Sequence, residues 1–357
     1  MANILGNHFS VHLFGQSHAP SVGAVIEGLP AGFRPDWNRV QSFMARRAPG
    51  NSALSTARKE ADLPEILSGL NEHGETCGAP LAIRIVNGDH HSGDYEQLKS
   101  TPRPGHADAA AFLKYNGHHD LRGGGQFSGR LTAPLCFAGA LALQLLEAKG
   151  ICVKAHISEI AGIRDNAPDP SHPDLSSISE EGLAVVSANA GKKMEEAILN
   201  ARNNCDSVGG IIECFATGLP AGLGDPMFEG VENQLAQALF GIPGVKGVEF
   251  GTGFDAAKMK GSEHNDAFMF ENGTLKTETN HHGGILGGIT TGMPLIVRMA
   301  VKPTPSIAKA QKSVNLLTKE SASLSVSGRH DPCIVPRAVP VMEAAVACVI
   351  YDLLLTK

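Results

Sequence analysis

A repeated motif is the feature of this 357-residue chain that most constrains its fold. The stretch SVGAVIE at 21–27 recurs as SVGGIIE at 207–213, and GLPAG follows both copies, at 28–32 and at 218–222. Two matches in the same order favour an internal duplication over chance. Each copy has the pattern of a short strand that ends in a glycine–proline turn. The sequence therefore predicts two related halves.

The division between the halves is expected at a polar segment. Residues 166–177, NAPDPSHPDLSS, are rich in proline, aspartate and serine, which is typical of an exposed connection. This places the halves at roughly 1–165 and 178–357. Because related halves can pack around one shared core, we expect a single domain, 1–357, with internal pseudo-symmetry.

Alternating and periodic apolar residues predict a mixture of strands and helices. Strands are expected at 10–14, 23–28, 81–86, 153–160, 209–216, 246–251 and 294–301. Helices are expected at 36–47, 108–115, 132–150, 190–202, 229–241 and 339–355. Glycine-rich loops often follow the strands where a regular helix would be needed for a doubly wound parallel sheet. An α+β fold is therefore favoured.

Charge and composition exclude several classes of function. The formal net charge is -6 and only 5% of residues are aromatic, whereas nucleic-acid-binding surfaces are basic and use aromatic rings for stacking. No stretch approaches the roughly 18 uninterrupted apolar residues of a membrane span, and the first residues lack a secretory pattern. Seven scattered cysteines without a CxxC pair indicate reduced thiols, without disulfides or structural zinc. We expect a cytoplasmic protein that binds neither nucleic acid nor membrane.

Arginines gather beside glycine and proline in several loops. They are Arg46 and Arg47 in ARRAPG, Arg103 in RPGHAD, Arg122 and Arg130 around GGG, and Arg329 in SGRHDPC. Such loops let backbone and guanidinium groups approach a ligand closely, and the guanidinium group suits phosphate and carboxylate. A single arginine in a loop is usually only solvated. Four such clusters in an acidic protein indicate a local anion-binding site.

The stretch HHDLRGGGQFSGR at 118–130 is the leading candidate for part of that site. It lacks the lysine of GxxxxGK[ST], and Ser128 stands where GxGxxG needs its last glycine, so neither common phosphate motif is present. Ser128 or Thr132 can cap the helix expected from residue 132, whose N-terminal amides favour an anion. From the loop alone, a tight turn without a ligand is an equal alternative.

Two histidines and an aspartate are candidates for acid–base chemistry. His18 in FGQSHAP and His106 in RPGHAD lie in loops rich in glycine, proline and serine. A histidine near an anion can donate a proton close to neutral pH. Asp331 in GRHDPC can act as a base, and an Asx turn before the following proline is an equally natural alternative.

Adjacent histidine pairs do not indicate a metal site. The pairs lie at 90–91, 118–119 and 281–282. Neighbours in sequence point apart, and no HExxH motif or cysteine partner accompanies them. No metal is therefore expected.

Seven motifs, taken in order, resemble those of the chorismate synthase family. They span nearly the whole chain and are FGQSHAPSVGAVIEGLPAG, RPGHAD, DLRGGGQFSGRLTAP, GVKGVEFGTGF, NHHGGILGGITTG, VKPTPSI and GRHDPCIVPRAVPVMEA. The resemblance implies a β-α-β sandwich with internal pseudo-symmetry, assembled as a homotetramer. It also implies a carbon–oxygen lyase of the shikimate pathway of aromatic amino acid biosynthesis. The implied reaction is the anti-1,4-elimination of phosphate from 5-enolpyruvylshikimate 3-phosphate to give chorismate, with reduced FMN and no net redox change.

The resemblance further implies roles for individual residues. His18 would protonate the departing phosphate, His106 would keep the flavin correctly protonated, and Asp331 would help the flavin take up the ring proton. The implied substrate-binding residues are Ser17, Arg47, Arg103, Arg130 and Arg329. The implied flavin contacts are Gln126, Phe127, Ser128, Pro243, Gly244, Gly287, Lys302, Pro303, Thr304, Pro305, Ser306 and Arg329.

Some positions depart from the family's usual motifs. GESHG is replaced by GQSHA, which introduces Gln16 and Ala19. GGRSSARETA is replaced by GGQFSGRLTA, which introduces Gln126, Phe127 and Leu131. Flavin contacts on this side are therefore expected to be rebuilt, while the reaction is expected to survive.

Two functions from other classes remain open beside the lyase. One is a flavin-binding electron carrier or sensor that kept the scaffold, and the other is a phosphometabolite-binding regulator without catalysis. Retention of His18, His106 and Asp331 favours the enzyme, because a pure binder has less need of an acid and a base. No dinucleotide fingerprint for FAD or NADPH is present, so reduced FMN is expected from a separate source, although an unfamiliar NADPH site stays open.

Overall fold

The first part of the chain forms an antiparallel sheet. The computed structural model describes residues 3–50, 54, 62–88, 100–120, 122–326 and 331–356. The strands of this sheet, in the order β1-β2-β3-β5-β4, are β1 (Ile4–Leu5), β2 (Val11–Gly15), β3 (Ser21–Ile26), β5 (Leu81–Val86) and β4 (Pro64–Ser68). Along β5 the residues Leu81, Ile83 and Ile85 are buried and alternate with more exposed ones. One face of the sheet therefore packs on the core.

A second antiparallel sheet is built from the rest of the chain. Its strands, in the order β7-β6-β8-β14-β9, are β7 (Ile163–Arg164), β6 (Cys152–Ile160), β8 (Gly210–Thr217), β14 (Leu295–Val301) and β9 (Val245–Phe250). The central strand β8 places Cys214 opposite Ala155 of β6 and opposite Val297 of β14. These three side chains are buried, so the core continues across the inner face of this sheet.

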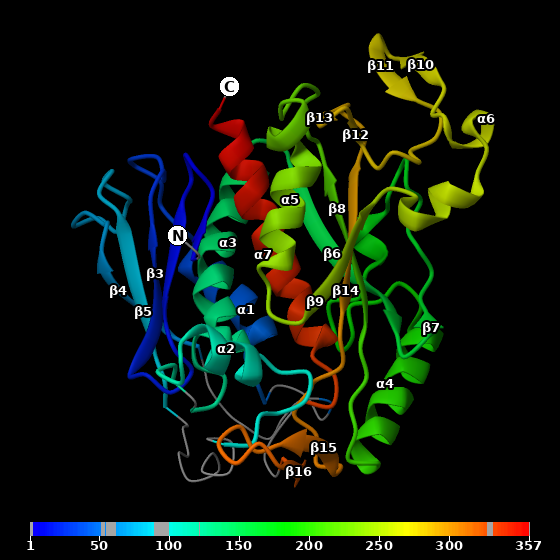
Figure 1. Ribbon diagram of the computed structural model, residues 1–357. Helices are drawn as coiled ribbons and strands as arrows, with labels where there is room; N and C mark the ends of the chain where they lie inside the picture. The colour runs from blue at the N-terminus through cyan, green and yellow to red at the C-terminus, as the bar shows by residue number, and fades with distance from the viewer. Residues whose placement is uncertain are drawn as a thin grey trace.

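Four helices fill the space between the two sheets, as Figure 1 shows. They are α1 (Trp37–Arg47), α3 (Thr132–Glu147), α5 (Val231–Phe240) and α7 (Val335–Leu354). Helices α3 and α7 pack against each other and are buried almost all round, because each has a sheet or another helix on every side. Within the described residues, the stretch 129–147 is long and apolar enough to cross a membrane, but most of it is buried inside the protein.

The two sheets share one connectivity. The first half runs β2, β3, α1, β4, β5, α3 and the second runs β6, β8, α5, β9, β14, α7. The sheet orders β2-β3-β5-β4 and β6-β8-β14-β9 correspond strand for strand. The first copy of the repeated motif starts with β3, and the second copy runs from residue 207 into β8, so the two copies enter equivalent strands. The fold is an α+β sandwich with internal pseudo-symmetry.

The expected division between the halves needs correction. Strands β6 and β7 precede the polar segment 166–177, yet both pair within the second sheet. The chain therefore passes from the first sheet to the second between the end of α3 and the start of β6. The polar segment is a connection inside the second half.

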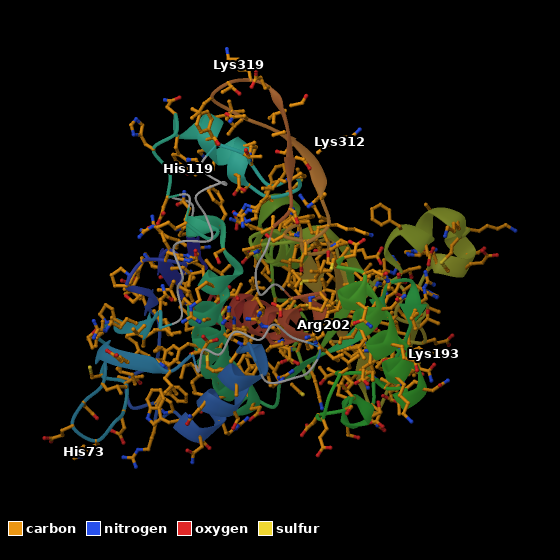
Figure 2. The ribbon with its side chains drawn as sticks, turned by 90° about the horizontal axis from the view of Figure 1, so that it is seen from below. His73, His119, Lys193, Arg202, Lys312 and Lys319 are labelled. Atoms are coloured by element: carbon orange, nitrogen blue, oxygen red, sulfur yellow. The ribbon has the colours of Figure 1, made fainter. Side chains whose placement is uncertain are left out.

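Smaller elements lie around the sandwich. They are α2 (Asp108–Lys114), α4 (Ala188–Asn203), α6 (Gly261–His264) and the hairpins β10–β11 (Phe268–Glu271, Thr274–Thr277), β12–β13 (Ile285–Leu286, Ile289–Thr290) and β15–β16 (Gln311–Val314, Ser321–Leu324). Seen from below in Figure 2, Lys193 of α4 and Lys312 and Lys319 of the β15–β16 hairpin point outward. These cations belong to the solvated periphery of the protein.

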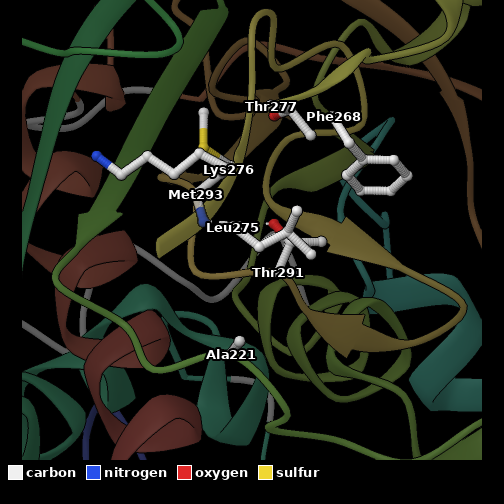
Figure 3. A pocket seen from close by; sticks show the side chains of 7 residues that line it. All are labelled: Ala221, Phe268, Leu275, Lys276, Thr277, Thr291 and Met293. Atoms are coloured by element: carbon white, nitrogen blue, oxygen red, sulfur yellow. Dashed lines mark hydrogen bonds between the residues drawn. The ribbon is translucent and has the colours of Figure 1, made fainter. Parts of the chain in front are cut away.

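A small cavity of about 200 Å³ lies beside the β10–β11 hairpin (Figure 3). Its lining is mostly apolar and consists of Ala221, Phe268, Leu275, Lys276, Thr277, Thr291 and Met293. The amine of Lys276 bonds to Glu271 at 2.5 Å. None of the residues predicted for catalysis or binding lines this cavity.

Candidate active site

A larger cavity, of about 750 Å³, lies where the central helices α3 and α7 begin. The glycine-rich loop before α3, the start of α7 and loops from both halves surround it. Its lining includes the predicted residues Ser17, His18, Arg47, Arg103, His106, Gln126, Phe127, Ser128, Arg130, Pro243, Gly244, Lys302, Pro303, Thr304, Pro305, Ser306 and Asp331. Because α3 and α7 both start here, their N-terminal ends favour negative charge in the cavity.

The glycine run packs against His18. The Ser17 hydroxyl lies 3.1 Å from Nδ1 of His18, donates to the carbonyl of Arg122 at 3.2 Å and accepts from the amide of Gly124 at 3.2 Å. His18 is only 5% exposed. Gly123 has a φ of +64°, and a Cβ there would meet the histidine ring. The glycine in this loop thus leaves the space that the His18 ring occupies. His18 lines the cavity beside the loop.

A carboxylate joins the predicted residues Arg103 and His106. Oδ2 of Asp108 accepts from Nε of Arg103 at 2.8 Å, and Oδ1 accepts from Nη2 of Arg103 at 2.8 Å. Oδ1 also lies 2.5 Å from Nδ1 of His106. Burial alone would raise the pKa of Asp108, but hydrogen bonds from Arg103 and His106 hold that pKa well below its ordinary value. Asp108 is therefore a carboxylate at neutral pH.

A second buried carboxylate joins Arg47 and Arg130. Asp62 has a side chain with no exposed surface and bonds to one guanidinium with each oxygen. Burial would raise the pKa of Asp62, but the charges of Arg47 and Arg130 lower it overall. Arg47 also donates to Thr132 Oγ1 at 3.1 Å, and Arg130 donates to Asn87 Oδ1 at 2.9 Å. The group of two arginines and one aspartate carries a net positive charge at the cavity wall.

Asp331 reaches the cavity at the start of α7. Its Oδ2 accepts from Nη1 of Arg337 at 2.5 Å, and Nε of Arg337 donates to the carbonyl of Arg47 at 2.9 Å. Asp331 is 9% exposed. Arg337 thereby ties α7 to the end of α1. The predicted Arg329 lies outside the described residues.

The comparisons with known proteins identify the family. A family model for chorismate synthase matches residues 9–355. The chain belongs to the chorismate synthase family. The chorismate synthase of Korarchaeum cryptofilum is 47% identical over 357 residues, covering 98% of this chain and 96% of the relative. That of Thermococcus kodakarensis is 47% identical over 352 residues, covering 99% and 97%. A crystal structure of a chorismate synthase matches with a TM-score of 0.77 and 28% identity, covering 98% of this chain and 93% of that one.

The family requires a reduced flavin, and part of the cavity lining fits such a group. Thr304 has a buried hydroxyl that no other described residue hydrogen-bonds. A Cβ at Gly129 would meet no atom within 4 Å, so space is open beside this backbone. Burial and the nearby charge of Lys246 lower the pKa of Lys302. Two lysines, an unsatisfied hydroxyl and open backbone are suited to a flavin that carries a phosphate.

Residues of the altered loop also line the cavity of this chorismate synthase family member. Nε2 of Gln126 donates to the Tyr115 hydroxyl at 3.0 Å, and Phe127 is 37% exposed. The hydroxyl of Ser128 accepts from the amide of Arg130 at 3.1 Å, so it caps the short 3-10 turn Gly129–Leu131. The expectation that Ser128 or Thr132 caps the long helix directly is therefore corrected, because α3 has no side-chain cap.

Three residues singled out from the sequence do not line the cavity. Gly287 lies in the turn between β12 and β13, and the flavin contact implied for it stays a prediction. Arg46 points to the other side of α1 and pairs with the buried Glu343 at 2.6 Å. Arg122 pairs with Asp120 at 2.9 Å on the surface. Within the ranges that the structure describes, no group of three or more potential metal ligands occurs.

Sequence reasoning missed the residues that hold the predicted ones in place. Asp108 and Arg337 lie within motifs recognised in the sequence, so their charges next to predicted site residues were a usable signal. Asp62 lies in no motif, and nothing in its sequence context distinguishes it. Lys246 and Tyr115 also line the cavity and were not predicted.

Proposed function

We propose that the protein converts 5-enolpyruvylshikimate 3-phosphate into chorismate and inorganic phosphate by anti-1,4-elimination, with reduced FMN and without net redox change. One observation carries this proposal. A single cavity gathers His18, His106 and Asp331 with the predicted Arg47, Arg103 and Arg130, beside residues suited to a phosphate-bearing flavin. An allylic phosphate leaves only where cations and a proton donor stabilise its departing oxygen, and this cavity supplies both.

The substrate carries a phosphate and two carboxylates, which match the cationic wall. Arg47, Arg103 and Arg130 would bind these anions, and the Ser17 hydroxyl beside them would add a hydrogen bond. His18 would give its proton to the phosphate oxygen as the carbon–oxygen bond breaks. The hydrogen bond between Ser17 and His18 would keep the histidine ring directed at that oxygen. Arg329, which the family resemblance also implies, would complete the anion contacts.

Other residues of the cavity would bind the flavin and handle the second proton. When bound, reduced flavin supplies transient electron density that assists carbon–oxygen cleavage and regains it afterwards. His106 would keep the flavin correctly protonated, and Asp331 would assist removal of the ring proton. The backbone of Gln126 through Ser128, the turn at Pro243 and Gly244, and the segment Lys302–Ser306 would contact the flavin.

The proposed assembly rests on the same resemblance, whereas the proposed location and flavin supply rest on the sequence. We propose a homotetramer located in the cytoplasm, which takes reduced FMN from a separate source. The absence of a dinucleotide fingerprint in the sequence supports a mononucleotide held by scattered loops. The formal charge of -6 agrees with a small anionic substrate held locally and with no nucleic-acid partner.

The experiment is an anaerobic assay of chorismate formation by the purified protein. Chemically reduced FMN and oxidised FMN are compared with the same substrate. Chorismate that forms only with reduced FMN would support the proposal and show that Gln126, Phe127 and Leu131 are tolerated. Binding of both ligands without product would contradict it and favour a flavin-binding electron carrier or a regulator.

Two variants test the assigned roles in the same assay. His106→Ala and Asp331→Ala should each lower turnover while leaving the substrate bound, because neither residue is assigned to hold the substrate anions. Substrate affinity is measured by calorimetry. An unchanged turnover number for either variant would remove the role of that residue.

A further inference from the structure

Asp108 lies behind the cavity and contacts two predicted site residues at once. One oxygen, Oδ1, lies 2.5 Å from Nδ1 of His106 and 2.8 Å from Nη2 of Arg103. The other, Oδ2, accepts from Nε of Arg103 at 2.8 Å and from its backbone amide at 3.0 Å. The Asp108 side chain is 11% exposed and that of Arg103 is 4% exposed. Within the part of the chain that the structure describes, the hydrogen bonds of this carboxylate are thus with these two residues.

These contacts decide which nitrogen of His106 carries hydrogen. The pKa of Asp108 is lowered by Arg103 and His106 despite its burial, so Asp108 has no proton to offer at neutral pH. The short contact between Oδ1 and Nδ1 therefore needs a hydrogen on Nδ1. Nη2 of Arg103 lies 3.1 Å from the same nitrogen and could donate to it only if Nδ1 carried no hydrogen. The two hydrogens of Nη2 already have acceptors in Oδ1 of Asp108 and the carbonyl of Gly123, and a bare Nδ1 would place two lone pairs 2.5 Å apart.

A second feature fixes Arg103 in the same unit. Its Nη2 donates to the carbonyl of Gly123 at 2.6 Å, and its Nη1 lies 3.4 Å from the hydroxyl of Ser306. Gly123 belongs to the loop that holds His18, and Ser306 belongs to the segment assigned to the flavin. Asp108 therefore orients an arginine that links these two segments of the cavity lining.

We propose that Asp108 is a positioning residue that fixes His106 as the tautomer with hydrogen on Nδ1 and at the same time orients Arg103. Nε2 of His106 is then the nitrogen that can exchange a proton with a ligand in the cavity. Asp108 touches neither substrate nor flavin in this proposal and acts only through its two neighbours. The kinetic consequence rests on the proposed function, whereas the tautomer itself does not.

The first test reads the tautomer directly and needs no turnover. The protein is labelled with ¹⁵N-histidine, the His106 signals are assigned with His106→Gln, and spectra are recorded in alkaline buffer, where the neutral ring is observed. Hydrogen on Nδ1 is expected in the unaltered protein. In Asp108→Asn the amide can donate to Nδ1 instead, so hydrogen should move to Nε2. Hydrogen on Nε2 in the unaltered protein, or no change in Asp108→Asn, would overturn the proposal.

The second test separates the two neighbours by kinetics. Asp108→Asn should lower kcat about 100-fold, the lower end of what a positioned acid or base contributes, and should raise KM through Arg103. In a His106→Ala background, Asp108→Asn should leave kcat at the value of His106→Ala alone, because the histidine through which Asp108 affects kcat is gone. The second substitution should still raise KM, because it still disturbs Arg103. An equal further loss of kcat in both backgrounds would show that Asp108 does not act through His106.

Two further variants keep these tests interpretable. Asp108→Glu retains the charge, so hydrogen should stay on Nδ1 and part of the kcat should return. Asp255→Asn removes an exposed carboxylate that pairs with Lys258 on the surface and should change neither the tautomer nor the kinetics. If no chorismate forms but the tautomer switches as expected, the proposed function fails and the positioning role of Asp108 holds. If chorismate forms but the tautomer of His106 does not change in Asp108→Asn, the proposed function holds and the positioning role of Asp108 fails.

Discussion

Gly123 lies directly against the ring of His18. A Cβ atom at Gly123 would stand 2.4 Å from Cε1 and 2.5 Å from Nδ1 of that ring, and 2.7 Å from Oγ of Ser17. The residue also has a φ of +64°, which glycine adopts at little cost. The first residue of the GGG run must thus be glycine, because the His18 ring occupies the space that a Cβ would need.

Replacing this glycine should affect turnover more than stability. In Gly123→Ala the His18 ring must shift, and a displacement on the order of 1 Å at a reacting group can lower a rate about 100-fold. We expect a loss of that size in kcat, measured in the anaerobic assay.

Gly150→Ala is the matched control for that variant. Gly150 has a φ of +76°, but a Cβ there would meet no atom within 4 Å. Both variants carry the same kind of backbone strain, about 1 kcal/mol, and only Gly123→Ala should lose turnover. Full activity in Gly123→Ala would show that His18 does not need its present position.

Asp62→Asn should weaken both folding and substrate binding. The substitution leaves two buried guanidinium groups without their shared counter-ion, and breaking a buried ion pair costs about 3 kcal/mol or more. We expect a loss of that order in the free energy of unfolding, measured with urea at neutral pH, and a raised KM. Glu65→Gln breaks the half-exposed pair with Arg84 and should cost less than about 1 kcal/mol. Equal effects of the two substitutions would contradict the role assigned to Asp62.

Lys302→Met should weaken flavin binding. Lys302 and Lys246 both line the cavity. Burial and the repulsion from Lys246 lower the pKa of Lys302. An anion bound between two such cations would relieve this repulsion. Loss of one charged contact costs about 1.5 kcal/mol or more, so the Kd for FMN should rise at least about 10-fold. Titration of flavin fluorescence at two salt concentrations measures this, and the variant should depend less on salt.

Lys309→Met serves as the control for the flavin titration. Lys309 pairs with Asp206 on the surface and lines no part of the cavity. Its Kd for FMN should equal that of the unaltered protein. The same affinity in Lys302→Met would remove Lys302 from the flavin site.

Acid should destabilise the protein partly through Asp266. Burial alone would raise the pKa of Asp266, but hydrogen bonds from Thr279, His281 and His282 lower it to about 2. A carboxyl with a lowered pKa in the folded state adds stability above its unfolded pKa of about 3.9, and that stability is lost as the pH falls toward 2.

The variant Asp266→Asn tests this dependence on pH. It should lose about 1 to 2 kcal/mol of unfolding free energy at neutral pH. Between about pH 4 and pH 2 its stability should fall less steeply than that of the unaltered protein, because one titrating group is missing. Urea unfolding at several pH values gives both quantities, and parallel curves would rule out this role of Asp266.

Much of the fold could be predicted from local patterns. The strand expected at 81–86 is β5, Leu81–Val86, because its alternating apolar residues pack on a core from one face. The helix expected at 36–47 is α1, which begins one residue later after its cap Asp36. The hairpin β10–β11 was not predicted, since exposed residues such as Phe268 and Phe270 give no clean amphipathic pattern.

The site was predictable only in part, for physical reasons. His18, His106 and Asp331 stand out because titratable residues in glycine-rich or proline-rich loops are unusual. Asp62 could not be found from sequence, because its partners Arg47 and Arg130 are brought to it only by the folding of distant segments. Long-range ion pairs of this kind leave no periodic signal in the chain.

The shared connectivity of the two sheets has a consequence for how this site can change. Helices α3 and α7 are counterparts and begin at one cavity, so the loops that precede them are two versions of the same structural position. The loop before α3 provides a glycine run and a support for His18, whereas the segment before α7 provides Asp331. A protein with two identical halves would present the same loop twice. Distinguishing substrate from flavin therefore depends on the differences that the two halves have accumulated.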